Sequence, residues 1–154
     1  MKVAEVMVTS VHSVGPDASV REVASLMLER RISGMPVVDG QGRILGIVSE
    51  GDLIRRPEIE TDRASAGWLH VFLSDGGRAR EFVKSHGRKV REVMTQPAIC
   101  VAPDTPLAMV VQLMERRRVK RLPVVENGRL VGLVTRADLL RALVTRQAQA
   151  PVAA

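Results

Sequence analysis

The chain has 154 residues, of which 45% are hydrophobic and 26% are charged, a balance typical of a globular protein with a buried core. Its only aromatic residues are Trp68, Phe72 and Phe82, so the core elsewhere must be aliphatic, and an aromatic platform for stacking nucleic-acid bases is excluded outside that segment. The net charge is +6, of which residues 93–154 carry +5 and residues 1–55 carry −1. Such a basic surplus attracts phosphate groups, whether of free nucleotides or of nucleic acid.

Cysteine content and hydropathy narrow the class of protein further. Cys100 is the only cysteine, which rules out an intrachain disulfide and a cysteine-based metal site, and we expect it to pack as a small buried hydrophobic residue. The opening segment MKVAEVMV contains Glu5 within its short apolar run and does not resemble a signal peptide. No apolar run approaches the roughly 18 residues of a membrane helix, so we expect a cytoplasmic protein without a membrane span.

An internal repeat organises the chain. Residues 3–39 align with 90–126, and residues 42–55 align with 128–141, with 22 of the 51 aligned positions identical. We therefore predict one unit at 1–56, a helical insertion at 57–89, a second unit at 90–146 and a flexible tail at 147–154.

Each copy predicts the elements β-α-β-β-α in the same order. A short strand, around Val14 or at 99–101, is followed by Pro16-Asp17 or Pro103-Asp104, where the aspartate is the expected helix N-cap. Apolar residues at helical spacing then predict a helix with one buried face. These residues are Val20, Val23, Ala24 and Met27 in the first copy and Leu107, Val110, Val111 and Met114 in the second.

Two buried strands and a second helix complete each copy. The strands begin at Met35 and Leu122 and return through turns at 40–42 and 127–128, where Asn-Gly is a strong hairpin signal. The second helices are expected to begin after Ser49 and after Thr135. One unit of about 50 residues cannot bury both faces of its sheet. We predict a mixed α/β (α+β) fold in which two units pack sheet to sheet with pseudo-two-fold symmetry.

The insertion belongs to neither copy. Residues 62–73 and 78–85 have a helical pattern, and they carry all three aromatic side chains. Trp68, Leu69, Phe72 and Leu73 form an apolar patch at helical spacing. This patch either covers the core or forms an interface between protomers, and we favour the first interpretation.

A hydroxyl residue followed three positions later by an aspartate occurs once in each copy. Ser49 precedes Asp52, and Thr135 precedes Asp138, each pair following a buried strand at the start of a helix. The hydroxyl can donate to a phosphate or ribose oxygen, the carboxylate can accept from ribose hydroxyls, and the unpaired backbone N–H groups favour an anion. The same spacing also forms a capping box, in which both side chains satisfy the helix itself. The segment can cap the helix when empty and bind a sugar when filled.

Together these motifs resemble a tandem pair of CBS (cystathionine-β-synthase) domains, called a Bateman module. The resemblance rests on Val-Met-Thr at 93–95, the segments 33–39 and 120–126, and the two Gly-x-x-Ser/Thr-x-x-Asp segments, and it covers residues 3–55 and 90–145. It implies that clefts between the units bind AMP, ADP, ATP or S-adenosylmethionine as regulatory ligands, and that the module forms a homodimer.

The resemblance also implies which residues line the two clefts, with ribose and phosphate on one unit and the base against the other. The first cleft combines Thr135, Arg136 and Asp138 with Ser10, Val11, His12, Ile32, Ser33 and Gly34. The second combines Ser49 and Asp52 with Pro97, Ala98, Ile99, Lys120 and Arg121. Arg136 could pair with a phosphate bidentately. In the first copy, Glu50 occupies the position of Arg136. Lys120 and Arg121, from the second copy, could offset the negative charge of Glu50 in the second cleft.

We therefore predict a non-catalytic sensor of adenosine-containing ligands that acts on a separate partner protein. The sequence contains no supported nucleophile–base pair, metal-ligand cluster or phosphate loop, so we expect neither an enzyme nor a cofactor or metal. Nucleic-acid binding is an alternative favoured by the basic run at 116–121, although aromatic interleaving and a recognisable reading helix are missing. A structural or partner-binding dimer with empty clefts is a third interpretation.

Overall fold

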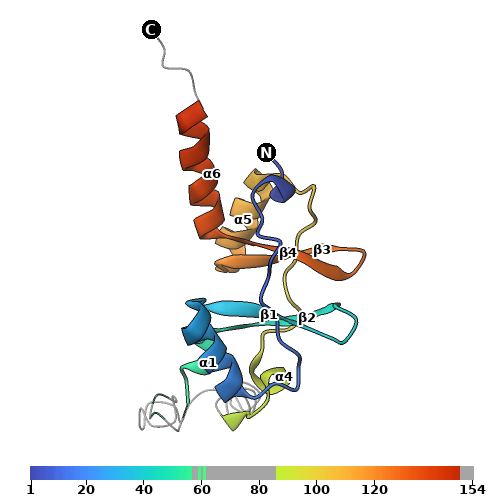
Figure 1. The fold of residues 1–154 in the computed structure, drawn as a ribbon, viewed down its shortest axis with the longest axis vertical. Helices are drawn as coiled ribbons and strands as arrows, with labels where there is room; N and C mark the ends of the chain where they lie inside the picture. Colours follow the sequence, from blue (N-terminus) through green and yellow to red (C-terminus); the bar gives the residue numbers. More distant parts are fainter. Residues whose placement is uncertain (57–58, 60, 62–85, 150–154) are drawn as a thin grey trace. The chain divides into compact units, whose positions relative to one another are not determined.

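A computed structural model describes residues 1–56, 59, 61 and 86–149. The elements in chain order are η1 (Val3–Glu5), α1 (Val20–Arg30), β1 (Gly34–Val38), β2 (Ile44–Ser49), α2 (Glu50–Leu53), α4 (Val90–Val93), α5 (Leu107–Arg117), β3 (Arg121–Glu126), β4 (Arg129–Thr135) and α6 (Arg136–Gln149) (Figure 1). The predicted mixture of helices and short antiparallel sheets is confirmed. The helices and the aromatic patch predicted at 62–85 lie outside the described residues.

The chain forms two compact units that do not coincide with the two sequence repeats. The first-repeat unit comprises His12–Pro97, and the second-repeat unit comprises Met1–Val11 together with Ala98–Ala154. The short arm that opens each repeat therefore folds with the other repeat. Figure 1 shows the N-terminal arm, in dark blue, running past α5 to β4.

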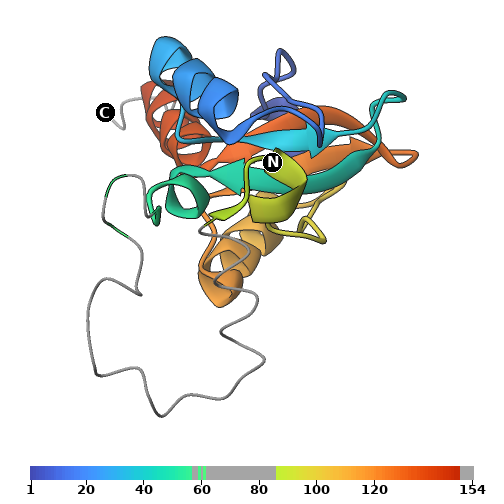
Figure 2. The same ribbon diagram turned by 90° about the horizontal axis from the view of Figure 1, so that it is seen from below.

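In the first-repeat unit, the β1–β2 hairpin gains a neighbour on each edge. Val14 lies parallel to β1, where its N–H donates to the Pro36 carbonyl at 3.1 Å and its carbonyl accepts from the Val38 N–H at 2.9 Å. Thr95 lies antiparallel to β2 and exchanges two backbone hydrogen bonds with Ile47, of 2.9 and 3.0 Å. Figure 2 shows α4, in yellow-green, next to β2.

The second-repeat unit repeats this arrangement with equivalent residues. Val101 lies parallel to β3, between the Pro123 carbonyl at 3.0 Å and the Val125 N–H at 2.9 Å. Val8 lies antiparallel to β4 and exchanges two hydrogen bonds of 2.9 Å with Leu133. Each unit thus completes its small sheet with a strand taken from the arm of the other repeat.

Gly46 and Gly132 allow these arms to approach the hairpins closely. A Cβ atom at Gly46 would lie 2.8 Å from the carbonyl oxygen of Thr95. At Gly132 it would lie 2.7 Å from the Met7 sulfur and 3.2 Å from the carbonyl oxygen of Val8. Both glycines are therefore explained by close packing of a neighbouring backbone.

Each unit has its own aliphatic core, built from the helix stripe, the Pro-Val-Val strand and the arm. The buried core of the first-repeat unit consists of Val23, Met27, Met35, Val37, Val48, Leu53, Val90, Val93 and Met94. That of the second-repeat unit consists of Val3, Val110, Met114, Leu122, Val124 and Val134. Val111, predicted to face the core, is instead 39% exposed.

The predicted helix N-caps, Asp17 and Asp104, are wrong. The N-caps are Ser19 for α1 and Pro106 for α5. The Ser19 hydroxyl accepts from the Glu22 N–H at 3.1 Å, and the Glu22 carboxylate accepts from the Ser19 N–H at 2.8 Å. These hydrogen bonds form a capping box, and hydrogen bonding of the carboxylate to the Ser19 N–H and side chain lowers the pKa of Glu22. Pro106 has no side-chain acceptor, so α5 lacks such a cap.

Asp17 contacts the arm instead of capping a helix. Its carboxylate pairs with Lys89 at 3.3 Å and with Arg91, at the start of α4. The backbone beside it bonds to the same arm, since the Val90 N–H donates to the Ala18 carbonyl at 2.9 Å. The turn before α1 is therefore held by the arm, and the helix begins two residues later than the sequence pattern predicts.

Candidate functional site

The Thr135 turn (residues 135–138) connects β4 to α6. The backbone N–H and the hydroxyl of Thr135 both donate to Oδ2 of Asp138, at 2.7 and 2.6 Å, and the Asp138 N–H reaches the Thr135 hydroxyl at 3.4 Å. The capping-box interpretation is therefore correct for this turn. These bonds also hold the hydroxyl and the carboxylate in one fixed arrangement at the start of α6.

Asp138 is 2% exposed and forms an ion pair. Its Oδ1 accepts from the guanidinium of Arg141, one turn along α6, whose side chain is 68% exposed. A carboxylate has about four acceptor positions, of which Thr135 and Arg141 occupy three. A vicinal diol that donates two hydrogen bonds to Asp138 must therefore displace one of them. We expect the diol to displace Arg141, whose side chain is exposed, because Thr135 is part of the helix cap.

A pocket of about 490 Å³ opens beside this carboxylate within the second-repeat unit. It lies between the N-terminal arm and α6, and its lining residues are Met1, Glu5, Val6, Asp138, Arg141, Ala142 and Thr145. The sequence prediction included only Asp138 from this set. The spacing of three between Asp138 and Arg141 on one helix face is the signal that identifies the arginine.

The Ser49 turn (residues 49–52) forms the same two hydrogen bonds to its aspartate and has different neighbours. The N–H and the hydroxyl of Ser49 donate to Oδ2 of Asp52 at 2.9 and 2.8 Å. Oδ1 accepts from the hydroxyl of Thr95, on the arm, at 3.3 Å. Arg55 aligns with Arg141 in the repeat, but α2 ends at Leu53, so Arg55 is not carried on that helix.

Three basic residues accompany the Thr135 turn in its own unit. Arg121 lies opposite Thr135 in the β3–β4 ladder, and the Arg136 N–H donates to the Lys120 carbonyl at 3.1 Å. Lys120 and Arg136 are exposed, and Arg121 is half-buried. Cationic residues at the start of β3 and at the start of α6 therefore lie close to the Thr135 turn, which favours an anionic group there.

The equivalent positions of the Ser49 turn carry no cation. Gly34 lies opposite Ser49 in the β1–β2 ladder, and the Glu50 N–H donates to the Ser33 carbonyl at 3.1 Å. The backbone contacts match those of the other unit, whereas the charge beside the turn is negative. The two turns therefore share their backbone contacts and differ in the charge of the neighbouring side chains.

The remaining predicted residues are divided between the units. Ser10, Val11, Ala98 and Ile99 belong to the second-repeat unit, and His12, Ile32 and Pro97 belong to the first-repeat unit. Both predicted clefts combine residues of the two units. The shared clefts therefore stay a prediction, and the geometry established here is that of the two turns.

Cys100 is half-buried rather than fully buried, and its thiol donates to the Ala98 carbonyl at 3.5 Å. Burial raises the pKa of this thiol. Residues 1–56, 59, 61 and 86–149 bring together no group of three His, Cys, Asp or Glu side chains suited to a metal ion. In the same part of the chain, no helix has the length and apolar character needed to cross a bilayer.

Comparisons with known sequences identify the repeat. Residues 3–58 and 90–145 both match the family model described as the CBS domain. Protein MJ1426 of Methanocaldococcus jannaschii is 32% identical over 139 residues, which cover 83% of this chain and 83% of that protein. The chloroplastic CBS domain-containing protein CBSX1 of Arabidopsis thaliana is 30% identical over 137 residues, covering 85% of this chain and 58% of that protein.

Solved structures agree with the sequence matches. The crystal structure of CBSX2 in complex with AMP has a TM-score of 0.83 and 27% identity, and the match covers 95% of this chain and 98% of that chain. The CBS domain pair of protein MJ0100, in complex with 5'-methylthioadenosine and S-adenosyl-L-methionine, has a TM-score of 0.71. At 22% identity and 95% coverage of this chain and 98% of that chain, the second match shows the fold alone.

Proposed function

Since the chain belongs to the CBS domain family and carries that domain twice, we propose that it is a regulatory module that binds adenosine-containing ligands at its hydroxyl–carboxylate turns. In this role it catalyses no reaction and acts on a separate partner protein. We propose further that it works in the cytoplasm as a homodimer. AMP is the first ligand to test, because CBSX2, at 27% identity, was crystallised with it.

The observation that carries this proposal is the state of Asp138. Its carboxylate is 2% exposed, is oriented by Thr135 and lines a pocket of about 490 Å³. A fixed, largely desolvated carboxylate beside an open volume is well suited to accept hydrogen bonds from a vicinal diol, because little reorganisation is needed on binding. The ribose of an unmodified nucleoside supplies such a diol.

Arg136 gives the same turn a role in binding phosphate. It is exposed at the N-terminus of α6, a helix of 14 residues, where the helix dipole favours an anion. A guanidinium at this point can form two parallel hydrogen bonds to a phosphate. Ribose on Asp138 and phosphate on Arg136 together describe a nucleotide rather than a free sugar.

The other residues implied by the family resemblance complete the proposal. The base of the nucleotide held by Thr135, Arg136 and Asp138 contacts Ser10, Val11, His12 and the segment 32–34. The second ligand, held by Ser49 and Asp52, contacts the segment 97–99 together with Lys120 and Arg121. ADP, ATP and S-adenosylmethionine are the other candidate ligands.

A thermal-shift titration of the purified chain with AMP, ADP, ATP, S-adenosylmethionine and adenosine tests the proposal. Because a ligand that binds only the folded state raises the melting temperature, at least one of these compounds should stabilise the protein in a saturable way. Absence of stabilisation by all five, at ligand concentrations of about 1 mM, overturns the adenosine assignment.

Arg136→Ala separates the phosphate contact from the ribose contact. Its side chain makes no ion pair with a carboxylate of residues 1–56, 59, 61 and 86–149, so the fold should tolerate the change. AMP should bind about tenfold more weakly, because a charge-assisted hydrogen bond pair is lost, while adenosine should bind as before. Equal losses for AMP and adenosine would show that Arg136 does not contact the phosphate.

A further inference from the structure

The charge difference between the two repeats comes from four aligned positions. Over the aligned segments the second repeat is more positive than the first by six charges. The four changes, from the first repeat to the second, are Glu29 to Arg116, Ser33 to Lys120, Gly34 to Arg121 and Glu50 to Arg136. The remaining charge differences between the copies cancel. The basic surplus of this chain is therefore a local feature and not a general bias of composition.

All four positions lie close together in the second-repeat unit. Arg116 and Arg117 form the last turn of α5, Arg118 is its C-cap, and Lys120 and Arg121 lead into β3. The backbone contact between Lys120 and the first residue of α6 brings Arg136 to the same place. We call this set the basic cluster: Arg116, Arg117, Arg118, Lys120, Arg121 and Arg136.

Apart from Arg121, the basic cluster is exposed and is not neutralised by the described part of the chain. Five of its members are exposed, and Arg121 is half-buried. Apart from Arg121, they form no ion pair with any carboxylate of residues 1–56, 59, 61 and 86–149. Glu115 is the only acidic residue between positions 115 and 121. The cluster therefore keeps a strong positive potential that a polyanion can use.

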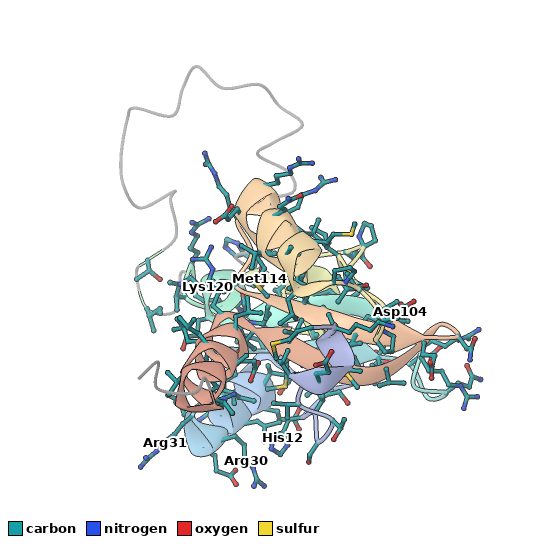
Figure 3. All side chains as sticks on the ribbon, turned by 90° about the horizontal axis from the view of Figure 1, so that it is seen from above. His12, Arg30, Arg31, Asp104, Met114 and Lys120 are labelled. Atoms are coloured by element: carbon teal, nitrogen blue, oxygen red, sulfur yellow. The ribbon has the colours of Figure 1, made fainter. Side chains whose placement is uncertain are left out.

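The equivalent helix end in the first repeat, at the end of α1, provides a comparison. Arg30 and Arg31 occupy the same positions at the end of α1 as Arg117 and Arg118 at the end of α5. Figure 3 shows both side chains pointing away from α1, and it labels Lys120 of the basic cluster. Glu29 pairs with Arg30 at 3.4 Å, whereas the equivalent position holds Arg116 in the cluster. Two basic residues are enough to complement a helix C-terminus, so the other four need a different explanation.

The chemistry of the cluster favours phosphate groups over an acidic protein. Five of its six cations are arginines, whose planar guanidinium can bind phosphate oxygens in pairs. Between positions 115 and 121 the one apolar residue, Val119, is half-buried, so the part of the cluster on α5 and β3 lacks the exposed apolar anchor of a typical protein interface. The exposed Leu140 lies on α6, one turn beyond Arg136. Residues 86–149 contain no aromatic side chain for stacking unpaired bases. A duplex bound through its backbone fits these features best.

We propose that the basic cluster binds the phosphate backbone of a duplex nucleic acid without reading its sequence. Arginines from the end of α5, the start of β3 and the start of α6 contact successive phosphates. Base-edge contacts are not part of this binding mode, which is therefore strongly dependent on salt. The proposal goes beyond adenosine binding and does not depend on it, although Lys120, Arg121 and Arg136 take part in both.

Fluorescence anisotropy with the full chain and a labelled DNA duplex of mixed sequence tests the proposal. If six phosphates are neutralised, the logarithm of the binding constant should fall with a slope of about −5 against the logarithm of salt concentration. Affinity should therefore drop about a thousandfold between about 50 and about 200 mM salt. No binding at the lower salt concentration overturns the proposal.

A pair of matched double variants locates the surface. Arg117→Glu with Arg118→Glu should weaken duplex binding at least about tenfold and reduce the salt slope by about 2. Arg30→Glu with Arg31→Glu makes the same change of charge at the same helix position of the other repeat, and it should change affinity less than about threefold. Equal losses in both variants would mean that overall charge, and not the cluster, attracts DNA.

Two competitors decide the class of partner. Duplex RNA should compete with the labelled DNA, because both present a phosphate backbone. Polyglutamate of equal charge should compete much less, because it lacks the spacing and geometry of phosphates. If polyglutamate competes as well as the duplex, the surface is a site for acidic proteins and the nucleic-acid proposal is wrong. None of these measurements uses an adenosine ligand, so failure here leaves the function proposed above intact.

Discussion

The Ser49 turn and the Thr135 turn have the same backbone and different chemistry. In both, the hydroxyl residue donates twice to the aspartate three positions later, at 2.6–2.9 Å. The second carboxylate oxygen then accepts from neutral Thr95 in one turn and from cationic Arg141 in the other. The helix that follows has four residues in α2 and 14 in α6.

The fold sets the location of the two turns, whereas their neighbours differ. The hairpin register places Ser49 opposite Gly34 and Thr135 opposite Arg121, so the location of each turn follows from strand pairing. The residues that set the charge beside each carboxylate, such as Glu50, Arg136 and Arg141, are exposed and can differ without disturbing the core. The fold therefore supplies two equivalent turns, and the charge beside them differs.

The arm contacts give the largest expected difference between the units. Gly46→Ala should destabilise the protein by about 3 kcal/mol, because the new methyl group meets the rigid backbone oxygen of Thr95. Gly132→Ala should cost about 1–2 kcal/mol, because its closest contact is the flexible Met7 side chain. Urea unfolding measures both. Gly40→Ala, with nothing within 4 Å, is the control, and a Gly132 variant less stable than the Gly46 variant would contradict the account.

Ligand affinity should reveal the contact between Arg141 and Asp138. Arg141→Gln removes the charged competitor for Oδ1, and adenosine should bind about fivefold more tightly, which corresponds to loss of an ion pair with one exposed partner worth about 1 kcal/mol. Adenosine is the right probe because it has no phosphate that a guanidinium could attract. Calorimetric titration measures the change, and Arg55→Gln is the matched control. Weaker adenosine binding in the Arg141 variant would show that this side chain contacts the ligand.

The helix caps provide a smaller contrast. Ser19→Ala should destabilise the protein by about 1 kcal/mol, because the hydroxyl accepts the Glu22 N–H. Pro106→Ala, at the equivalent position, removes no side-chain hydrogen bond and should have a smaller effect. Thermal unfolding of the two variants checks this. Equal losses would mean that the capping box does not stabilise α1.

The same cap predicts a weak pH effect. Hydrogen bonds from Ser19 lower the pKa of Glu22 below its ordinary value of 4.5. A carboxyl group whose pKa is lowered by folding contributes stability above its ordinary pKa, and that contribution is lost as pH falls through the lowered value. Stability should therefore decline more steeply below pH 4.5 in the wild type than in Glu22→Gln. Parallel acid unfolding curves would contradict this role.

Local features of the fold were predictable from sequence, and long-range ones were not. Asn127 and Gly128 adopt positive φ values of 50° and 78°, as the Asn-Gly hairpin signal indicates, and helices begin after Ser49 and Thr135 as predicted. The exchange of arms between repeats has no local signal, because it depends on contacts between distant segments. The only hint is a glycine at position 46 and again at 132, where a neighbouring backbone comes close.

The candidate site shows the same division. Thr135 and Asp138 are identified by their spacing, which is local. Thr95 could not be assigned to Asp52 from sequence, since the contact depends on the arm of the other repeat. The expected N-cap at Asp17 failed for a related reason, because that aspartate is bound to the arm through Lys89 and Arg91.

Calorimetric titration of AMP into the wild type, Asp138→Asn and Asp104→Asn tests whether the Asp138 carboxylate binds the nucleotide. Asparagine keeps one acceptor oxygen for the Thr135 cap but loses the second carboxylate oxygen, and Asp104 is an exposed aspartate outside both turns. Wild type and the Asp104 variant should bind AMP equally, and the Asp138 variant should lose at least about tenfold in affinity. Unchanged AMP binding in a folded Asp138 variant would contradict the assignment of this carboxylate to the ligand.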